Sequence, residues 1–507
     1  MQDLNKELLT SGFKFPEDLK VGQYKELPEK VLQFGEGNFL RGFVDWMFNE
    51  MNKKGLFNGK VVIVQPIGHG MVDLLNAQDS LYTLLLRGIQ NGKVVEDKEI
   101  ITSVSRGLSP YSQYNEFMKC AENPDLRVIV SNTTEAGIAY NPNDKLKDEP
   151  QASFPGKLTA FLYKRFKAFN GDFKKGFIII PCELIDRNGD NLKKIVFQLA
   201  DEWDLGADFI NWLEKGNYFL NSLVDRIVTG YPRDEVEKLT NELGYKDNGL
   251  DTAEIFHFWA IEGDPKLAEE LPFAKAGLNV VFTEDMTDYR SRKVRILNGA
   301  HTMTVLAAYL YGKDTVKECM DDELISKYMN KGIFEEIIPT LDLPKAELEE
   351  FAAAVSERFG NPFIKHYVLS ISLNSTSKFK ARVLPSIKEY INRKGKLPQA
   401  LSFSLAALIA FYRGTEIEGT SLIGKRPLGN TYEIKDDMPV LDFFKAQWSA
   451  YDETALGAEK LVKAVLANTA FWGEDLNKIE GFTKVVSDNL YGILTKGVET
   501  ALKTFIK

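Results

Sequence analysis

The chain has 507 residues, which is more than a single hydrophobic core usually supports, so we expect two or three domains. Its composition, 44% hydrophobic and 27% charged, is typical of a globular protein. A formal net charge of -9 argues against a nucleic-acid-binding surface, although it is compatible with a local basic pocket for a small anion.

The sequence shows no pattern of export, membrane insertion or metal binding. The amino terminus is polar and acidic, and no apolar run reaches the length of a membrane span, so we expect a cytoplasmic protein without a membrane partner. Cys120, Cys182 and Cys319 form no CxxC pair, which favours reduced structural thiols. The four histidines show no HxH or HxxxH spacing, so no metal site is expected.

The first half of the chain alternates apolar strands with helical patterns. The apolar segments are residues 30–34, 61–67, 126–131, 177–181 and 278–282. Continuous apolar runs are typical of parallel strands that are covered on both faces. This alternation predicts an α/β, Rossmann-like doubly wound domain over residues 1–285.

The second half is predicted to be mainly α-helical, over residues 286–507. Apolar residues recur at helical spacing in 345–359, 379–392, 401–412 and 461–466. Residues 292–301 lie at the boundary of the two predicted domains, where ligand clefts tend to form.

Two glycines follow the first strand, where a dinucleotide-binding turn needs them. Glycine at Gly35 and Gly37 would permit a tight turn and the close approach of a pyrophosphate. The third glycine of the GxGxxG pattern would fall at Leu40 and is missing, so an ordinary strand-to-helix turn is the alternative interpretation. The cofactor-binding residues expected here are Phe34, Gly35, Glu36, Gly37, Asn38 and Phe39.

Polar residues also follow the next two strands. Gln65 stands where an acidic ribose ligand is expected, and no arginine there could hold a 2'-phosphate, so NAD is favoured over NADP. Asn132, Thr133 and Thr134 follow the third strand and are expected to face the cofactor. A helix cap is the alternative role for these residues.

Lys293, Asn298 and His301 fall on consecutive turns of one predicted helix. At about 100° per residue, Lys293 and Asn298 lie roughly 140° apart around the axis, and Asn298 and His301 roughly 60°, so all three can border one cleft. Removing an ammonium from water disfavours its charged form, which suits a lysine to acid/base catalysis. The alternative is a packed helix with a solvated lysine, a capping asparagine and a core histidine.

Taken together, these segments resemble the mannitol dehydrogenase family of polyol-specific long-chain dehydrogenases. The family's GxG turn, VDR segment, serine–lysine pair and KxxxxNxxH signature read here as Gly35 and Gly37, Val224–Arg226, Ser377–Lys378, and Lys293, Asn298 and His301. Longer runs, among them LQFGEGNFLRGFVDW, SNTTEAGI and SLAALIAFYRG, extend the resemblance over nearly the whole chain.

The resemblance implies NADH-dependent reduction of a keto sugar acid, D-tagaturonate to D-altronate, without a metal. Lys293 would be the general acid, Asn298 would hydrogen-bond the carbonyl oxygen, and His301 would orient that oxygen or the substrate hydroxyls. Asp225 and Lys378 would line the substrate pocket. Fructuronate or a polyol is the alternative substrate, and a non-catalytic NAD-binding protein is the alternative class. Homo-oligomer and monomer both stay open.

Three positions depart from the polyol dehydrogenase pattern. Leu184 replaces an asparagine assigned to the oxyanion site, Arg290 replaces a glutamate, and Ser370 replaces an arginine. These departures disfavour a simple polyol. A uronate adds a carboxylate, and the cations available to pair with it are Arg290, Arg292, Lys378 and Arg382.

Overall fold

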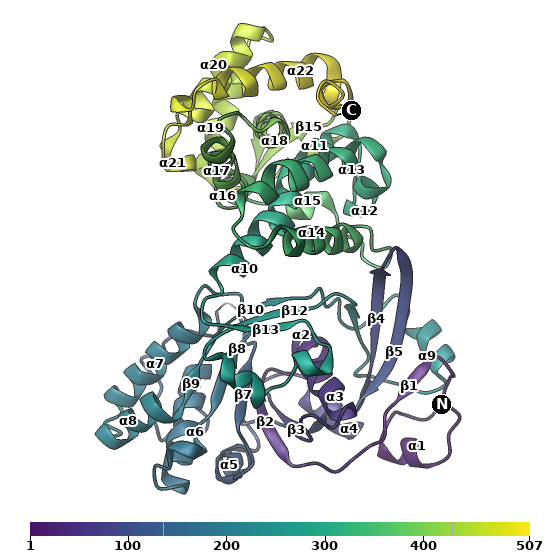
Figure 1. Ribbon diagram of the computed structural model, residues 1–507, viewed down its shortest axis with the longest axis vertical. Coiled ribbons are helices and arrows are strands. Elements are labelled where there is room, and N and C mark those ends of the chain that lie inside the picture. The colour runs from purple at the N-terminus through teal and green to yellow at the C-terminus, as the bar shows by residue number, and fades with distance from the viewer. Residues whose placement is uncertain (135, 428, 507) are drawn as a thin grey trace. The chain divides into compact units, whose positions relative to one another are not determined.

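In the computed structural model the chain divides into two compact units, drawn in Figure 1. The structure describes residues 1–134, 136–427 and 429–506. The first unit comprises residues 1–88 and 93–286, and the second comprises residues 89–92 and the chain from 287 onward. The predicted fold class, a Rossmann-like domain followed by a mainly helical one, is confirmed. The assignment of cofactor to one region and substrate to the other stays a prediction.

A six-stranded parallel sheet forms the centre of the first unit. Its strand order is β6 (Val104–Leu108), β3 (Lys60–Val64), β2 (Glu29–Phe34), β7 (Val128–Ser131), β8 (Ile178–Pro181) and β9 (Tyr218–Phe219). Four of these strands had been predicted from their apolar runs. Because side chains alternate between the faces, such runs supply apolar residues to both sides of the sheet.

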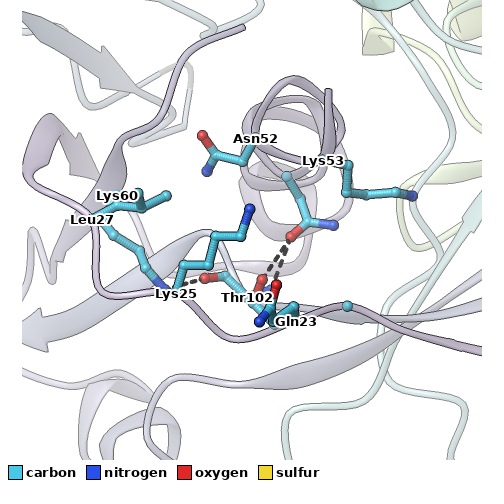
Figure 2. A pocket seen from close by; sticks show the side chains of 9 residues that line it. Gln23, Lys25, Leu27, Asn52, Lys53, Lys60 and Thr102 are labelled. Atoms are coloured by element: carbon cyan, nitrogen blue, oxygen red, sulfur yellow. Dashed lines mark hydrogen bonds between the residues drawn. The ribbon is translucent and has the colours of Figure 1, made fainter. Parts of the chain in front are cut away.

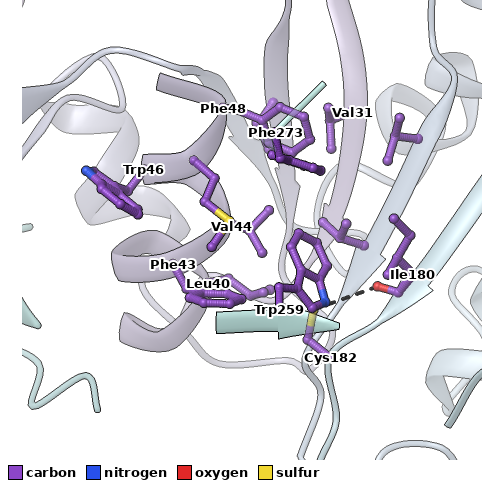
Figure 3. Close-up of a cluster of buried hydrophobic side chains, with 14 of the residues drawn as sticks. Val31, Leu40, Phe43, Val44, Trp46, Phe48, Ile180, Cys182, Trp259 and Phe273 are labelled. Carbon is purple, nitrogen blue, oxygen red and sulfur yellow. Dashed lines mark hydrogen bonds between the residues drawn. The ribbon is translucent and has the colours of Figure 1, made fainter. Parts of the chain in front are cut away.

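Each face of this sheet has its own core. Val31, Val61 and Ile180 belong to one cluster, and their neighbours Leu32 and Val62 belong to the other. Figure 3 shows the first cluster, in which Leu40, Phe43 and Val44 of the helix after β2 face Val31 and Ile180 of the sheet. The helices of the first unit are α1 (Lys6–Thr10), α2 (Asn38–Leu40), η1 (Arg41–Asp45), α3 (Trp46–Lys53), α4 (Val72–Ala77), α5 (Tyr114–Lys119), α6 (Phe154–Ala168), α7 (Asn188–Glu202), α8 (Ala207–Gly216) and α9 (Val236–Leu243).

Two smaller sheets complete the first unit. One has the order β1 (Leu19–Val21), β5 (Lys93–Ile101), β4 (Tyr82–Gln90) and β11 (Asp251–Glu254), and the other has the order β10 (Asn221–Asp225), β12 (Phe258–Glu262) and β13 (Val280–Thr283). Strands β4 and β5 were not predicted, and β13 was. Cys120, Cys182 and Cys319 are buried free thiols, as predicted.

The second unit is built around buried helices. Helix α11 (Gly299–Tyr311) packs against α18 (Gln399–Phe411), which in turn packs against α22 (Phe482–Leu502), and every residue of α18 from Ala400 onward is buried. The other long elements are α10 (Thr287–Arg292), η6 (Lys293–Asn298), α12 (Val316–Asp321), α13 (Glu323–Asn330), η7 (Lys331–Ile337), α14 (Lys345–Phe359), α16 (Ser375–Arg382), α17 (Leu384–Lys394), α19 (Met438–Ser449) and α20 (Ala455–Leu466). No described helix is long and apolar enough to cross a lipid bilayer.

Two predictions for the second unit were wrong in detail. The helix expected over 379–392 is two helices, α16 and α17, because Pro385 has no backbone N–H to continue the first. The unit also contains an antiparallel sheet of β14 (Gly414–Glu418), β15 (Ser421–Lys425) and β16 (Thr431–Ile434), where no strand was expected.

Candidate functional site

The loop after β2 requires glycine at its first position. Gly35 has a φ of +125°, and a Cβ there would lie 3.0 Å from the carbonyl oxygen of Asn132 and 3.2 Å from the Leu40 side chain. Gly37 caps the helical run that begins at Asn38, and a Cβ there would meet open space. This opening exposes a helix amino terminus, where backbone N–H groups attract an anion such as a pyrophosphate. The geometry therefore fits a dinucleotide.

Leu40 explains the missing third glycine of the fingerprint. Its side chain is 1% exposed and belongs to the core between the helix and the sheet. Phe34 is also a core residue, with its ring against Phe117 and Phe154 and its carbonyl accepting a hydrogen bond from the Asn132 amide at 3.0 Å. Its side chain therefore packs in the core beneath the loop, and its role in cofactor binding stays a prediction.

The ends of β7 and β8 are joined by Glu183, which the sequence analysis missed. Its Oε1 accepts from both the amide and the hydroxyl of Thr133 at 2.9 Å, and its Oε2 accepts from Ser131 at 3.0 Å. Burial raises the pKa of this carboxyl, against the effect of the hydrogen bonds. Thr134 has a φ of +72°. Helix α6 has its own cap, Ser153, which excludes the alternative role of residues 132–134 as a cap for that helix.

Glu36 and Gln65 meet beside Gly70. A Cβ on Gly70 would lie 2.0 Å from Glu36 Oε1 and 2.5 Å from Gln65 Oε1, so a larger residue there would displace these two side-chain ends. Gln65 donates to the carbonyl oxygen of Ile67 at 2.9 Å, and burial raises the pKa of Glu36. The residues expected to bind the cofactor, 34–39, 65 and 132–134, thus gather at the carboxyl ends of β2, β3 and β7.

The buried side chain of Arg41 forms hydrogen bonds with the loop that follows β2, which we call the cofactor loop. It is 0% exposed, and its guanidinium donates to the carbonyl oxygen of Glu36 at 3.1 Å, to Asn38 Oδ1 at 2.8 Å and to the carbonyl oxygen of Gly249. Gln33 holds the same loop through the carbonyl oxygen of Gly35, at 3.1 Å. The loop is therefore fixed at Gly35, Glu36 and Asn38 by buried donors.

Two carboxyl groups share the interior with Arg41. Burial raises the pKa of Asp45 and of Asp251 to about 7, and the positive charge of Arg41 acts against that rise in both. Asp45 Oδ1 and Asp251 Oδ2 are buried without a hydrogen-bond partner among the described residues. Asp45 and Asp251 therefore lie close enough to interact electrostatically with Arg41, without a direct hydrogen bond to it.

In the second unit, the lysine–asparagine–histidine signature lies on a helix that is not regular. Residues Lys293–Asn298 form a π-helical segment between α10 and α11, and the Gly299 amide donates to the Val294 carbonyl five residues earlier. Residues five apart therefore lie nearly one above the other, so Lys293 and Asn298 share a side more closely than the α-helical angle predicted. A Cβ on Gly299 would lie 3.2 Å from the carbonyl oxygen of Arg382.

Basic groups surround His301. Its ring stacks on Phe359 with centroids 4.0 Å apart and stands perpendicular to His366 at 5.2 Å. Burial lowers the pKa of His301 well below its usual value, and His366, Arg358, Arg382 and Lys378 lower it further. The imidazole is therefore neutral at physiological pH. Its Nε2 is buried without a hydrogen-bond partner among the described residues.

Existing contacts reduce the number of cationic side chains that could bind a substrate carboxylate. Arg292 is 4% exposed, donates to Glu347 at 2.6 Å and stacks on Phe351, so it is already committed. Lys378 donates to the carbonyl oxygen of Ile371 at 2.9 Å, and Arg382 makes a long 3.4 Å contact with Thr302. Neither forms an ion pair with a described carboxylate.

The remaining sequence candidates lie in the first unit. Asp225 ends β10 and is 5% exposed. Leu184, which replaces the oxyanion asparagine, is 63% exposed directly after Glu183. Among the described residues, no group of three or more histidine, cysteine or acidic side chains is arranged to hold a metal ion.

Comparisons with known proteins cover nearly the whole chain. The mannitol dehydrogenase Rossmann domain matches residues 29–275, and the mannitol dehydrogenase C-terminal domain matches residues 285–494. Altronate oxidoreductases of Escherichia coli O6:K15:H31 and O1:K1 are each 49% identical over 487 residues, which is 96% of this chain and 98% of theirs.

Two solved structures have a similar fold. A substrate-free D-sorbitol dehydrogenase is 22% identical, with a TM-score of 0.82 and coverage of 99% of this chain and 100% of that one. Mannitol 2-dehydrogenase of Pseudomonas fluorescens, in a ternary complex with NAD and D-mannitol, is 21% identical, with a TM-score of 0.67 and coverage of 99% of each chain.

Replacement of Arg41 tests its hold on the cofactor loop. We expect Arg41→Gln to weaken NADH binding about 10- to 100-fold, because the loop loses donors to two of its positions. Fluorescence titration of the folded protein with NADH measures this.

Arg165→Gln is the matched control. Like Arg41, Arg165 is buried, at 1% exposed, and it donates to the backbone carbonyls of Lys175, Ala121, Asn123 and Leu126. Its replacement is expected to lower thermal stability without changing NADH affinity. Equal NADH affinity in the two variants would show that Arg41 has only a general structural role.

Proposed function

Because the chain belongs to the mannitol dehydrogenase family, we propose that it is an NADH-dependent reductase that converts D-tagaturonate to D-altronate. The predicted family membership is confirmed by matches to both of the family's domains. The 49% identity to altronate oxidoreductases over 96% of the chain supports the choice of this substrate. Buried free thiols support the cytoplasmic location expected from the sequence.

The single observation that favours a sugar acid is the set of basic groups around His301. Lys378, Arg382, Arg358 and His366 all lower the pKa of this histidine. Positively charged groups that lie close together repel one another, and a bound anion relieves that repulsion. A uronate carries such an anion and a polyol does not, so the cluster supports tagaturonate over fructose or mannitol.

The proposed chemistry needs a hydride donor, a proton donor and groups that stabilise the developing alkoxide. NADH, when bound, supplies the hydride. Lys293 donates its proton to the carbonyl oxygen as that oxygen becomes a hydroxyl, and it takes the proton back in the oxidation direction. Asn298 shares its side of the helix and donates an amide hydrogen bond to the same oxygen. The neutral His301 orients the substrate without adding a charge.

Lys293→Ala tests the proposed general acid. We expect kcat for tagaturonate reduction to fall about 10²- to 10⁴-fold, because proton transfer in the transition state is lost, while the Kd for NADH stays nearly unchanged. Steady-state kinetics and NADH titration measure the two quantities. Turnover near that of the unaltered enzyme would exclude Lys293 from this role.

A substrate comparison tests the reaction itself. NADH oxidation measured with tagaturonate, fructuronate and fructose is expected to be fastest with tagaturonate. A preference for fructose would overturn the proposed substrate class. NADH binding with no turnover of any of the three would instead indicate a non-catalytic NAD-binding protein.

Arg382→Met tests the proposed recognition of the carboxylate. We expect KM for tagaturonate to rise about 10- to 100-fold, which corresponds to the loss of one charge-assisted hydrogen bond. The matched control is Lys380→Met on the exposed side of the same helix, which is expected to leave KM unchanged. Equal KM values in the two variants would assign the carboxylate to another cation.

A further inference from the structure

A second pocket in the first unit lies at the edge of the six-stranded sheet opposite the cofactor loop. Lys60, the first residue of β3, lines it, whereas Gln65, one of the residues expected to bind the cofactor, follows the other end of the same strand. The cavity measures about 240 Å³. Figure 2 shows it between the helix that carries Asn52 and Lys53 and the segment that carries Gln23 and Lys25. It is therefore separate from the cofactor site.

Lys60 is a buried cation without a counter-ion. Its residue is 2% exposed, and its Nζ donates to the carbonyl oxygen of Thr102 at 2.5 Å and lies 4.0 Å from the ring centroid of Tyr24. No carboxylate oxygen of the described residues lies within ion-pair distance of it. Burial lowers the pKa of Lys60 to about 8, with Lys6 adding to the effect and Glu26 opposing it.

The other two lysines of the pocket differ in their pairing. Lys53 is neutralised by Glu50 and Glu99, each at 2.7 Å from its Nζ. Lys25 is exposed and makes no ion pair with any described carboxylate. Two cations, Lys25 and Lys60, therefore border the pocket without an ion pair to any described carboxylate.

Hydrogen bonds between the walls fix the shape of the pocket. Asn52 bonds both the amide and the carbonyl of Gly59, at 3.1 Å and 2.8 Å. Asn49 Oδ1 accepts from the amide and the hydroxyl of Thr102, at 3.0 Å and 3.2 Å. The walls are therefore held before any ligand arrives, which reduces the entropy lost on binding.

We propose that this pocket binds a small doubly charged oxyanion, of the class of sulfate and inorganic phosphate, between the ammonium groups of Lys25 and Lys60. An anion there pairs with a buried ammonium group that contacts a carbonyl oxygen and an aromatic ring but forms no ion pair. The cavity is smaller than the roughly 300–1,000 Å³ of typical organic-ligand sites, which favours an ion with a few waters over a nucleotide.

Calorimetric titration of the full chain with sulfate tests the proposal, with sodium chloride holding the ionic strength constant. We expect saturable binding that weakens about tenfold or more in Lys25→Ala and in Lys60→Met. Inorganic phosphate is expected to show the same dependence on both lysines.

Lys30→Met is the matched control. Lys30, near the start of β2, also donates to a backbone carbonyl, that of Phe57 at 2.8 Å, and also lies over an aromatic ring, but it does not line the pocket. Its replacement is expected to leave sulfate affinity unchanged. If Lys60→Met fails to fold, Lys25→Ala decides, because that side chain is exposed. Equal affinity in Lys25→Ala and the unaltered protein, or the absence of saturable binding, would overturn the proposal.

The pH dependence provides a second readout. Sulfate keeps its double charge across the neutral range, so its affinity is expected to fall as the pH rises through about 8 and Lys60 loses its proton. The charged and titratable groups around the pocket are Tyr24, Glu26, Lys6, Lys25 and the cluster of Lys53, Glu50 and Glu99, in which burial raises the pKa of Glu99 to about 7. In Lys60→Met the part of the fall centred near pH 8 is expected to disappear, whereas any part near pH 7 that comes from Glu99 is expected to remain. An unchanged fall in that variant would contradict the role of Lys60.

Discussion

The parallel direction of the strands in the six-stranded sheet is the constraint on which the cofactor loop depends. Because β2, β3 and β7 all end at one edge, the residues that follow them meet there although they are far apart in sequence. The same direction places the beginnings of the strands, with Lys60, at the other edge. The parallel direction of the strands thus places the cofactor loop, built from backbone amides and glycines, at one end of the sheet. It places the pocket built from lysine side chains at the other end.

Buried charge is handled differently in the two units. In the first unit, Arg41 lies among carboxyl groups whose pKa values burial raises to about 7, so cation and acids are buried together. In the second, several basic groups lie near His301 and lower its pKa. A cation buried beside acids can hold a loop, whereas basic groups gathered in one place attract a ligand of the opposite sign. The first arrangement supports a loop, and the second suits the recognition of a ligand.

The sequence predicted those features that depend on local pattern. Continuous apolar runs gave β2, β3, β7 and β8, because parallel strands are buried on both faces. The β4–β5 hairpin was missed although Asn91 and Gly92 form its turn with φ values of +53° and +73°, a pairing that favours such turns. The role of Glu183 was not predictable, since its bonds to Ser131 and Thr133 join residues about fifty positions apart. A π-helical segment also cannot be recognised from the periodicity of apolar residues, because that prediction assumes 3.6 residues per turn.

In the π-helical segment Lys293–Asn298, the direction of the Lys293 side chain depends on the number of residues in the turn. A π turn holds more residues than an α turn, so this segment stands one deletion away from a regular helix. Removing one residue between Lys293 and Asn298 would return the segment to α-helical geometry with its flanks in nearly the same register, but it would shorten the spacing of the signature by one residue. The number of residues in this turn is therefore as important to the site as the identity of its side chains. A comparison of relatives by residue identity alone would overlook it.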